Sequence, residues 1–196
     1  DIDAGTYPFV TSSNTGVLGI WKSYDLHPSE INHVIAITKA YTTRVGNGPM
    51  PTTIKGKERD LIIEKGGEVG VTTGRVRDPG WLDLVLLKFA CQKNKANHIA
   101  MTKLDIFSNF NEIKLCIGYE LNGKKTNYIS GDAETLEKCK PVYESVPGWS
   151  EDISKVRTFK KLPKNAKNYI KKIENFVGVP IDFIGVGPNR EEVIYV

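Results

Sequence analysis

The chain has 196 residues, of which 40% are hydrophobic and 26% are charged, as is typical of a globular protein with a sizeable core. Its formal net charge of +4 is spread along the sequence, with neither a basic arm nor an acidic tail. This distribution argues against nucleic acid as the main partner and fits a small anionic ligand better. The longest strictly apolar run, residues 84–87, is too short to cross a membrane, so no membrane partner is expected.

The cysteines and histidines give no sign of a metal or redox site. The three cysteines lie far apart without a Cys-x-x-Cys spacing, which indicates reduced thiols in a cytoplasmic protein. The three histidines have no metal-like spacing and no obvious carboxylate neighbour, so no catalytic role is assigned to them. These residues are Cys91, Cys116, Cys139, His27, His33 and His98. The chain begins at Asp1 without an initiator methionine or a signal-peptide pattern, as a fragment would.

The order of apolar and polar residues predicts alternating strands and helices after a polar N-terminal loop over residues 1–26. The predicted elements are a strand over 33–45, helices over 57–65 and 81–95, a strand over 98–101, a hairpin of 112–121 and 124–129, a surface insertion over 130–140, a turn at 147–149, a helix over 163–177, and strands over 179–184 and 193–196. The hairpin is indicated by Asn122-Gly123, and the last helix by its apolar period.

This pattern predicts a single α/β unit over residues 1–196, with a largely parallel sheet, helices on both of its faces and an antiparallel hairpin. In such sheets, ligands bind at loops beyond the carboxyl ends of the strands. Three polar loops follow apolar runs in this way, after Val45, after Met101 and after Ile184. We therefore expect a ligand site to be built from these loops.

Residues 72–77 carry two hydroxyls, a glycine and two arginines. Guanidinium groups bind carboxylates and phosphates through bidentate, charge-assisted hydrogen bonds, so this segment is a candidate anion-binding loop. A surface loop whose arginines face water is an equally good interpretation.

Residues 102–105, Thr-Lys-Leu-Asp, are similar to the guanine-reading turn of GTP-binding proteins. A carboxylate there accepts hydrogen bonds from N1–H and the exocyclic amine of guanine, a donor pair that adenine lacks. Four residues alone are also typical of an ordinary turn at the end of a strand. Residues 185–188, Gly-Val-Gly-Pro, either let a ligand approach the backbone closely or form a tight turn.

Several longer motifs, taken in order, resemble the adenylosuccinate synthetase family. They are residues 1–14, residues 43–49 (Thr-Arg-Val-Gly-Asn-Gly-Pro), residues 72–75, residues 80–83, Leu104-Asp105, residues 147–149 (Pro-Gly-Trp) and residues 178–182. The resemblance extends over essentially the whole chain and corresponds to the C-terminal part of the family sequence. It implies the C-terminal part of a P-loop NTPase-like fold.

The resemblance further implies a GTP-dependent ligase of purine nucleotide biosynthesis that joins L-aspartate to IMP and gives adenylosuccinate. Mg²⁺, the phosphate loop, and the catalytic aspartate and histidine would belong to family sequence that this chain lacks, so no catalytic or metal-binding residue is expected here, and the piece alone should be inactive. A homodimer is implied for the full-length protein.

The family pattern also implies roles for particular residues. Those implied for IMP are Thr11, Val45 and Arg75. Those implied for aspartate are Val71, Thr72, Thr73, Gly74, Arg75, Val76 and Arg77. Those implied for GTP are Arg77, Lys103, Leu104, Asp105, Gly185, Val186 and Gly187.

Three departures from the family pattern suggest a changed substrate preference. Residues 16–21 replace a more glycine-rich stretch, Gly185 stands where many members have serine, and Val76 and Asp78 interrupt an arginine run. One alternative function is therefore a phage-type ligase that joins aspartate to a guanine nucleotide and spends ATP. Another is a non-catalytic interaction module that acts through the basic helix at Lys160 to Lys172.

Overall fold

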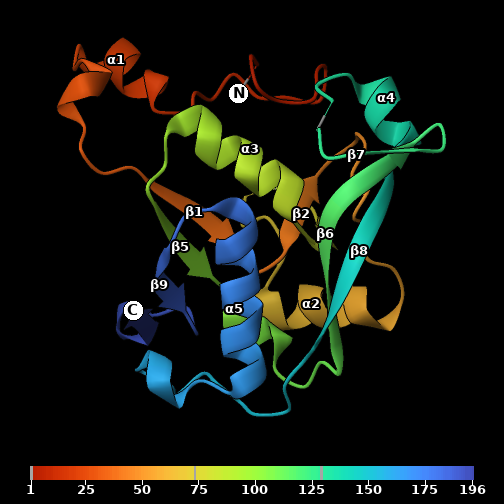
Figure 1. Cartoon of the computed structure of the whole chain (residues 1–196), viewed down its shortest axis with the longest axis vertical. Coiled ribbons are helices and arrows are strands. Elements are labelled where there is room, and N and C mark those ends of the chain that lie inside the picture. The colour runs from red at the N-terminus through yellow and green to blue at the C-terminus, as the bar shows by residue number, and fades with distance from the viewer. Residues whose placement is uncertain (1, 73, 129) are drawn as a thin grey trace.

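The computed structural model describes residues 2–72, 74–128 and 130–196 (Figure 1). Its α-helices are α1 (Leu18–Tyr24), α2 (Lys57–Gly66), α3 (Leu84–Asn94), α4 (Ala133–Lys138) and α5 (Lys164–Val177). Its strands are β1 (Ile35–Lys39), β2 (Thr42–Val45), β3 (Arg77–Gly80), β4 (Leu82–Asp83), β5 (His98–Thr102), β6 (Glu112–Leu121), β7 (Lys124–Thr126), β8 (Lys140–Pro147), β9 (Ile181–Gly185) and β10 (Val193–Tyr195). Four short 3₁₀ helices, η1 (Pro28–Glu30), η2 (Leu104–Phe107), η3 (Phe159–Lys161) and η4 (Arg190–Glu192), complete the assignment.

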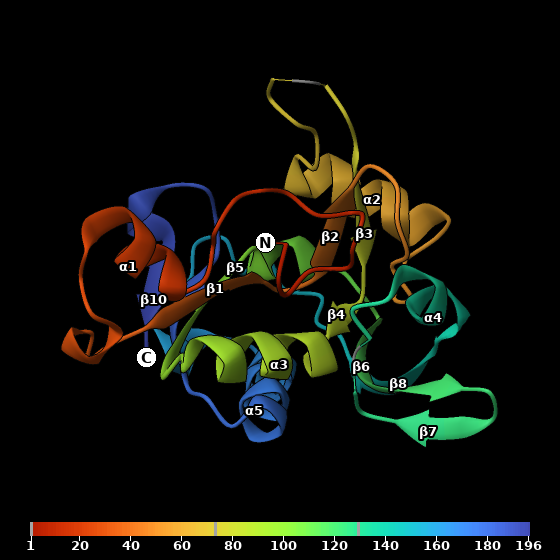
Figure 2. The same ribbon diagram turned by 90° about the horizontal axis from the view of Figure 1, so that it is seen from above.

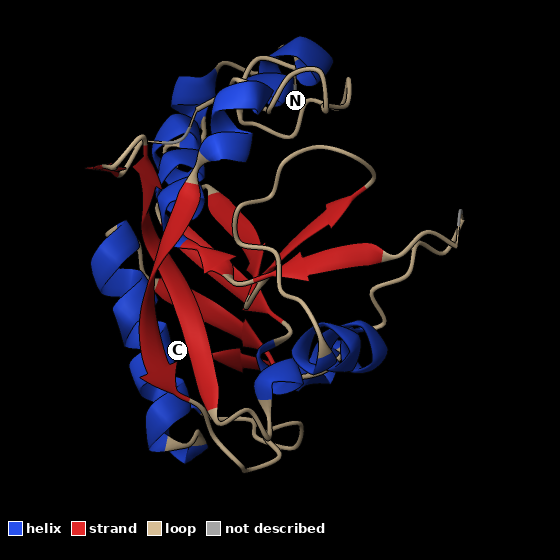
Figure 3. Cartoon of the chain, turned by 90° about the vertical axis from the view of Figure 1, so that its right-hand side faces the viewer, coloured by secondary structure: helices blue, strands red, loops and turns tan. Residues whose placement is uncertain are grey.

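The main sheet has the strand order β1-β5-β9-β10. β1, β5 and β9 run parallel, and β10 is antiparallel to β9. Strands β2 and β3 form a second, antiparallel sheet, and β6 pairs with β4, β7 and β8 in a third. Figures 2 and 3 show α3 and α5 on one side of the main sheet and α2 on the other. The predicted α/β class, with its parallel sheet and antiparallel hairpin, is confirmed.

The predicted strand over 33–45 is wrong in one respect, because it is two strands in two different sheets. The chain leaves the main sheet at Ala40, whose N–H still donates to Thr102 O at 2.8 Å. Tyr41 then turns into the core, where its side chain is 1% exposed. A continuous β-branched run cannot reveal such a break, because both strands have the same composition.

The helix predicted over 81–95 begins three residues later, at Leu84. Leu82 and Asp83 pair with β6 instead, and the Asp83 side chain accepts a hydrogen bond from Leu86 N at 3.0 Å. Asp83 is therefore the N-cap, which satisfies one of the free amides of the first turn. The predicted helices over 57–65 and 163–177 and the strands over 98–101, 179–184 and 193–196 are confirmed within a few residues.

The predicted N-terminal loop and the predicted surface insertion both contain regular structure. α1 lies within the predicted N-terminal loop, and α4 lies within the predicted surface insertion, where Leu136 is buried against β6. The sequence does not predict the strand β8, because prolines stand near both of its ends; in the structure, four of its eight residues are half-buried. The strand after Asn122-Gly123 is confirmed but ends at Thr126, and Ile129 lies outside the described residues.

The centre of the core is aromatic. Phe107, in η2, is fully buried. Five aromatic rings have their centroids within 5.2 to 6.4 Å of the Phe107 ring, namely Tyr41, Trp81, Phe110, Trp149 and Tyr169. Phe107 follows the turn at residues 103–105, so the same packing that fills the core also fixes that turn. None of the helices in the described part of the chain is long and apolar enough to span a membrane.

Replacing Phe107 by alanine should destabilise the fold, because it removes a fully buried ring from the middle of this cluster. We expect a loss of about 4 kcal/mol in the free energy of unfolding. Urea unfolding followed by tryptophan fluorescence measures the loss. Tyr24→Ala, at a residue that is 79% exposed, serves as the control and should cost less than about 0.5 kcal/mol. Equal losses in the two variants would contradict the central position of Phe107.

Candidate functional site

The carboxyl ends of β1, β5 and β9 lie at one edge of the main sheet, because the three strands are parallel. The loops predicted after Met101 and Ile184 therefore come together, and a side chain at Gly185 would lie 3.4 Å from Thr102 Cα. The loop after Val45 is different, since it follows β2 in the second sheet. The expectation of one site built from all three loops of a single sheet is corrected in this respect.

The turn after β5 is held in an unusual backbone conformation. Lys103 has φ +62°, in the left-handed region that non-glycine residues seldom adopt. Its ammonium group donates to Gly66 O and to Glu68 Oε1, the latter at 2.8 Å. These two bonds hold the Lys103 side chain against the end of α2.

Asp105 lies two residues further along the same turn. Its Oδ1 atom is buried and has no hydrogen-bond partner within the described part of the chain. Burial raises the pKa of the Asp105 carboxyl above its usual range. A buried acceptor without a donor is costly, so this oxygen is suited to a ligand that brings an N–H group. Leu104, between Lys103 and Asp105, is fully buried and belongs to the core.

The glycine turn after β9 provides a smooth wall beside this turn. Gly185 and Val186 are buried, and a Cβ atom on Gly185 would meet its neighbours only at ordinary van der Waals distances. There is therefore room at position 185 for a serine side chain, which the family pattern implies for many members. A Cβ atom on Gly187 would instead collide with the carboxylate of Glu192, which accepts from Asn189 N at 2.8 Å.

Sequence reasoning missed Glu68, which lies between α2 and the segment 71–77. Its carboxylate is 0% exposed and accepts hydrogen bonds from Tyr41 Oη at 2.6 Å and from the ammonium groups of Lys39 and Lys103, both at 2.8 Å. Arg77 Nη1 lies 3.6 Å from Glu68 Oε2. These five residues are called the Glu68 cluster below. A single Glu in a polar stretch carries no signal in the sequence, because its partners come from three other segments.

The Glu68 carboxylate is strongly stabilised in its ionised form. Burial alone would raise its pKa, but the hydrogen bonds from Lys103, Lys39 and Tyr41 outweigh burial and lower the pKa to about 2. In turn, burial beside the carboxylate raises the pKa of the Tyr41 hydroxyl well above its usual range. The Glu68 carboxylate therefore stays negatively charged at any physiological pH.

The candidate anion-binding loop projects away from the body of the molecule above α2 (Figure 2). Its base is an antiparallel bridge between Val69 and Val76, and Gly70 N donates to Arg75 O at 2.8 Å. Val71 is 99% exposed. Thr72, Gly74 and Arg75 are exposed as well, and Thr73 lies outside the described residues. The exposure matches the interpretation as a surface loop and leaves its side chains accessible to a ligand.

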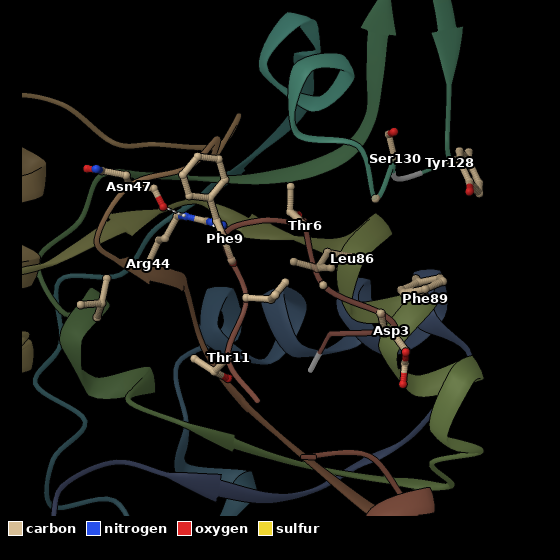
Figure 4. Close-up of a pocket in the computed structure, with 15 residues that line it drawn as sticks. Asp3, Thr6, Phe9, Thr11, Arg44, Asn47, Leu86, Phe89, Tyr128 and Ser130 are labelled. Atoms are coloured by element: carbon tan, nitrogen blue, oxygen red, sulfur yellow. Dashed lines mark hydrogen bonds between the residues drawn. The ribbon is translucent and has the colours of Figure 1, made fainter. Parts of the chain in front are cut away.

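A cavity of about 620 Å³ lies between the N-terminal segment, the end of β2 and α3 (Figure 4). Two of the three residues implied for IMP, Thr11 and Val45, line it, whereas Arg75 does not. Arg44 also lines it, donating to Phe9 O at 3.3 Å and to Asn47 O at 3.2 Å. Sequence reasoning missed Arg44, although its place beside Val45 in the motif at residues 43–49 is a usable signal.

Two of the family departures have a structural explanation. Asp78, which interrupts the arginine run, accepts a hydrogen bond from Arg59 Nη2 at 2.6 Å, so its charge is neutralised within the chain. Residues 16–21 lead into α1, where Gly19 is buried and a Cβ atom would lie 2.6 Å from Asn14 O. Glycine is therefore required at position 19 for packing.

The histidines need one correction. His98 was expected to have no carboxylate neighbour, but its Nδ1 atom is hydrogen-bonded to Asp182 on β9, and its Nε2 atom lies 3.1 Å from His33 Nδ1. These residues lie at the amino ends of the strands, opposite the turns described above. Among the described residues, no group of three or more His, Cys, Asp or Glu side chains could hold a metal ion.

The fold and these turns define an α/β protein of the kind that binds its ligands at the carboxyl ends of parallel strands. Residues 1–194 match the adenylosuccinate synthetase family. The chain belongs to the adenylosuccinate synthetase family, a family of ligases, as its motifs indicated.

Individual relatives agree with this assignment. The adenylosuccinate synthetase of Desulfatibacillum aliphaticivorans is 48% identical over 196 residues, which cover 100% of this chain and 46% of that protein. The enzyme of Clostridium perfringens is 46% identical over the same length and is also covered to 46%. The chloroplastic enzyme of Triticum aestivum is 47% identical over 196 residues and is covered to 41%. The chain thus spans a little under half the length of these relatives.

Solved structures give the same result for the fold. The fully ligated adenylosuccinate synthetase from Plasmodium falciparum matches with a TM-score of 0.97 and 42% identity, over 100% of this chain and 47% of that one. A cyanophage succinoaminodeoxyadenylate synthetase, bound to dGMP and to dATP as an energy donor, matches with a TM-score of 0.55 and 13% identity, over 97% of this chain and 41% of that one. The second likeness extends to the fold alone.

The low pKa of Glu68 predicts a pH-dependent contribution to stability. The pKa of about 2 lies below the ordinary value of 4.5, so the ionised carboxylate stabilises the fold above pH 4.5, and this contribution is lost as the pH falls toward 2. We expect Glu68→Gln to be less stable than the wild type at about pH 6, and the gap to narrow by about pH 3. Urea unfolding at several pH values measures it, with Glu64→Gln, on the exposed face of α2, as the control. A gap that does not change with pH would contradict the assigned charge.

Proposed function

We propose that this chain is the C-terminal portion of an adenylosuccinate synthetase, and that the complete protein joins L-aspartate to IMP at the expense of GTP. The products would be adenylosuccinate, GDP and phosphate. The chain would supply the guanine-binding and aspartate-binding parts of the site. The observation that carries the proposal is the buried and unpartnered Oδ1 of Asp105, at the edge where the turns after β5 and β9 meet.

Guanine carries the hydrogen-bond donors that the Asp105 carboxylate lacks. Its N1–H and exocyclic amine are two adjacent donors, which match the two oxygens of one carboxylate. In the proposal Asp105 accepts both, Lys103 packs its stem along the base, and Gly185, Val186 and Gly187 line the opposite side. Adenine presents an acceptor at N1 and would leave Asp105 Oδ1 unsatisfied, so the site favours GTP over ATP.

The cavity beside β2 is suited to the nucleotide monophosphate. In the proposal the hydroxyl of Thr11 holds the phosphate of IMP and the backbone of Val45 meets the ribose. Arg44 supports this assignment, because it places a guanidinium group in the wall of the same cavity. Burial lowers the pKa of Arg44, which nevertheless stays charged at neutral pH.

The exposed loop would bind the second substrate. Aspartate carries two carboxylates, and guanidinium groups bind carboxylates in bidentate pairs. In the proposal the loop of Val71, Thr72, Thr73, Gly74, Arg75, Val76 and Arg77 closes on these carboxylates. Arg75 would also contact IMP, and Arg77 would also reach GTP.

The order of events follows from leaving-group chemistry. The 6-oxygen of IMP is a poor leaving group until it accepts a phosphoryl group from GTP, after which the amine of aspartate displaces it as phosphate. A magnesium ion would neutralise charge on the transferring phosphoryl group. Following the family pattern, the proposal assigns the residues that hold this ion to family sequence outside this chain.

The surface of β1 supports the proposal that the chain is part of a larger protein. β1 is an edge strand of the main sheet, yet Ile35 is 46% exposed and Ile37 is 79% exposed. An open edge with apolar side chains is a liability that proteins normally cover. For the complete protein we propose a homodimer, and a cytoplasmic location that suits the three free cysteines.

The two alternatives receive less support. The phage-type ligase is related in fold only, at 13% identity, and the Asp105 carboxylate disfavours an adenine base. Two cations of the basic stretch proposed for an interaction module are already engaged within the chain: Lys172 forms an ion pair with Glu144, and Lys167 donates to the backbone oxygen of Lys160. Binding of RNA with a steep loss of affinity at high salt would favour the interaction module.

Asp105→Asn tests the base assignment in the complete protein. The amide would present a donor where guanine also has a donor, while xanthine has a carbonyl at that position. We expect the KM for GTP to rise by at least about 100-fold and activity with xanthosine triphosphate to appear, as loss of a charged hydrogen-bond pair predicts. Initial rates of adenylosuccinate formation measure both. A wild type that prefers ATP, or a variant with an unchanged KM for GTP, would contradict the proposal.

Arg75→Leu tests the loop. Arg75 lies outside the packed core, so the substitution should leave the free energy of unfolding almost unchanged. We expect the KM for aspartate to rise by about 100-fold, which corresponds to a lost charged pair of roughly 2.7 kcal/mol. Lys57→Leu, on exposed α2, is the matched control for removing a surface cation. An unchanged KM for aspartate would overturn the role of Arg75.

A further inference from the structure

Glu68 joins two segments that the proposed function assigns to different substrates. Its fully buried carboxylate is bound to Lys103, the first residue of the turn proposed for guanine, at 2.8 Å. It also lies 3.6 Å from Arg77, the last residue of the loop proposed for aspartate. Tyr41 and Lys39 supply the remaining donors. One carboxylate is therefore shared by both segments.

The contact with Lys103 bears on the shape of the guanine turn. Lys103 has a left-handed backbone, which is strained for a residue other than glycine. Within the described part of the chain, the Lys103 side chain donates to Gly66 O and to Glu68. Both acceptors lie at the end of α2, so the strained turn is held in place from there. Asp105, two residues further on, takes its position from this turn.

The contact with the aspartate loop is made by both the backbone and the side chain of Glu68. Glu68 O accepts from Arg77 N at 2.8 Å, next to the bridge between Val69 and Val76. Residues 68 and 77, which flank the base of the projecting loop, are therefore joined directly by this hydrogen bond. A change in the position of Glu68 would move the base of this loop together with Lys103.

We propose that Glu68 is a positioning residue that couples the guanine turn at residues 103–105 to the aspartate loop at residues 71–77. The inference rests on the proposed function and deepens it. Glu68 does not touch a reacting atom in this proposal. It holds three cations in one arrangement, and without its charge Lys39, Lys103 and Arg77 would repel one another.

Glu68→Gln in the complete protein tests the proposal, because it keeps the size of the side chain and removes its charge. We expect the KM values for GTP and for aspartate each to rise about tenfold, which corresponds to about 1.4 kcal/mol per substrate. The KM for IMP should rise less than either of these, because two of its three proposed contacts, Thr11 and Val45, line a cavity that Glu68 does not reach, and only Arg75 belongs to the loop. Glu64→Gln, four residues earlier on exposed α2, is the control and should change none of the three.

The coupling itself is tested by a double-mutant cycle with Lys103→Met. In the proposal Lys103 has no contact with aspartate, so its effect on the KM for aspartate, about threefold, must pass through Glu68. In the Glu68→Gln background the same substitution should cause no further rise. Independent, multiplying effects on the KM for aspartate would overturn the coupling.

The remaining outcomes are also decisive. A lower melting temperature with all three KM values unchanged, or an equal rise in all three, would reduce Glu68 to a structural role and overturn the proposal. If Glu68→Gln does not fold, Tyr41→Phe replaces it, since it removes one donor and leaves the charge. It should raise the KM values for GTP and aspartate about threefold and the KM for IMP by less. Failure of the proposed function is distinct, because it appears as absence of ligase activity in the wild type.

Discussion

The arrangement at the strand ends depends on one buried charge. The Glu68 carboxylate is removed from water, so its ionised form persists only because Lys39, Tyr41 and Lys103 donate to it and Arg77 lies nearby. Leaving such a charge without its partners costs on the order of 3–5 kcal/mol. The partners come from β1, from the segment before β2, from β3 and from the end of β5. The need to pair this one carboxylate thus holds two sheets and the end of α2 together at the edge where the ligands are proposed to bind.

The core beneath this edge is organised differently. Phe107 is surrounded by five aromatic rings, and its packing needs volume and shape but no charge. The two systems meet in Tyr41, whose ring packs on Phe107 and whose hydroxyl donates to Glu68. The turn at residues 103–105 is fixed from both sides, by Phe107 in the core and by Glu68 at the edge. This double support explains how Lys103 can keep its left-handed backbone.

The sequence predicted those features that depend on neighbouring residues. The buried face of α5 follows from an apolar period, and the turn at Asn122-Gly123 follows from the backbone that these residues prefer. The break at Ala40 and the strand β8 depend on distant partners, so no local pattern reveals them. The candidate site follows the same rule. The turns at residues 103–105 and 185–187 are contiguous in the sequence and could be predicted, whereas Glu68 could not, because the residues that bind its carboxylate lie up to 35 positions away.

The two proposed substrate segments differ in how firmly they are held, and this difference suits their ligands. The guanine turn is fixed by packing and by charged hydrogen bonds, which suits a flat base that must meet a carboxylate at a set distance. The base of the aspartate loop is held by backbone hydrogen bonds, whereas Val71, further along the loop, is 99% exposed. A small dicarboxylate gains little from a preformed open surface, because water competes for its charges. A loop that closes over the dicarboxylate excludes that water. A loop base held by Glu68 then defines the position of the closed loop.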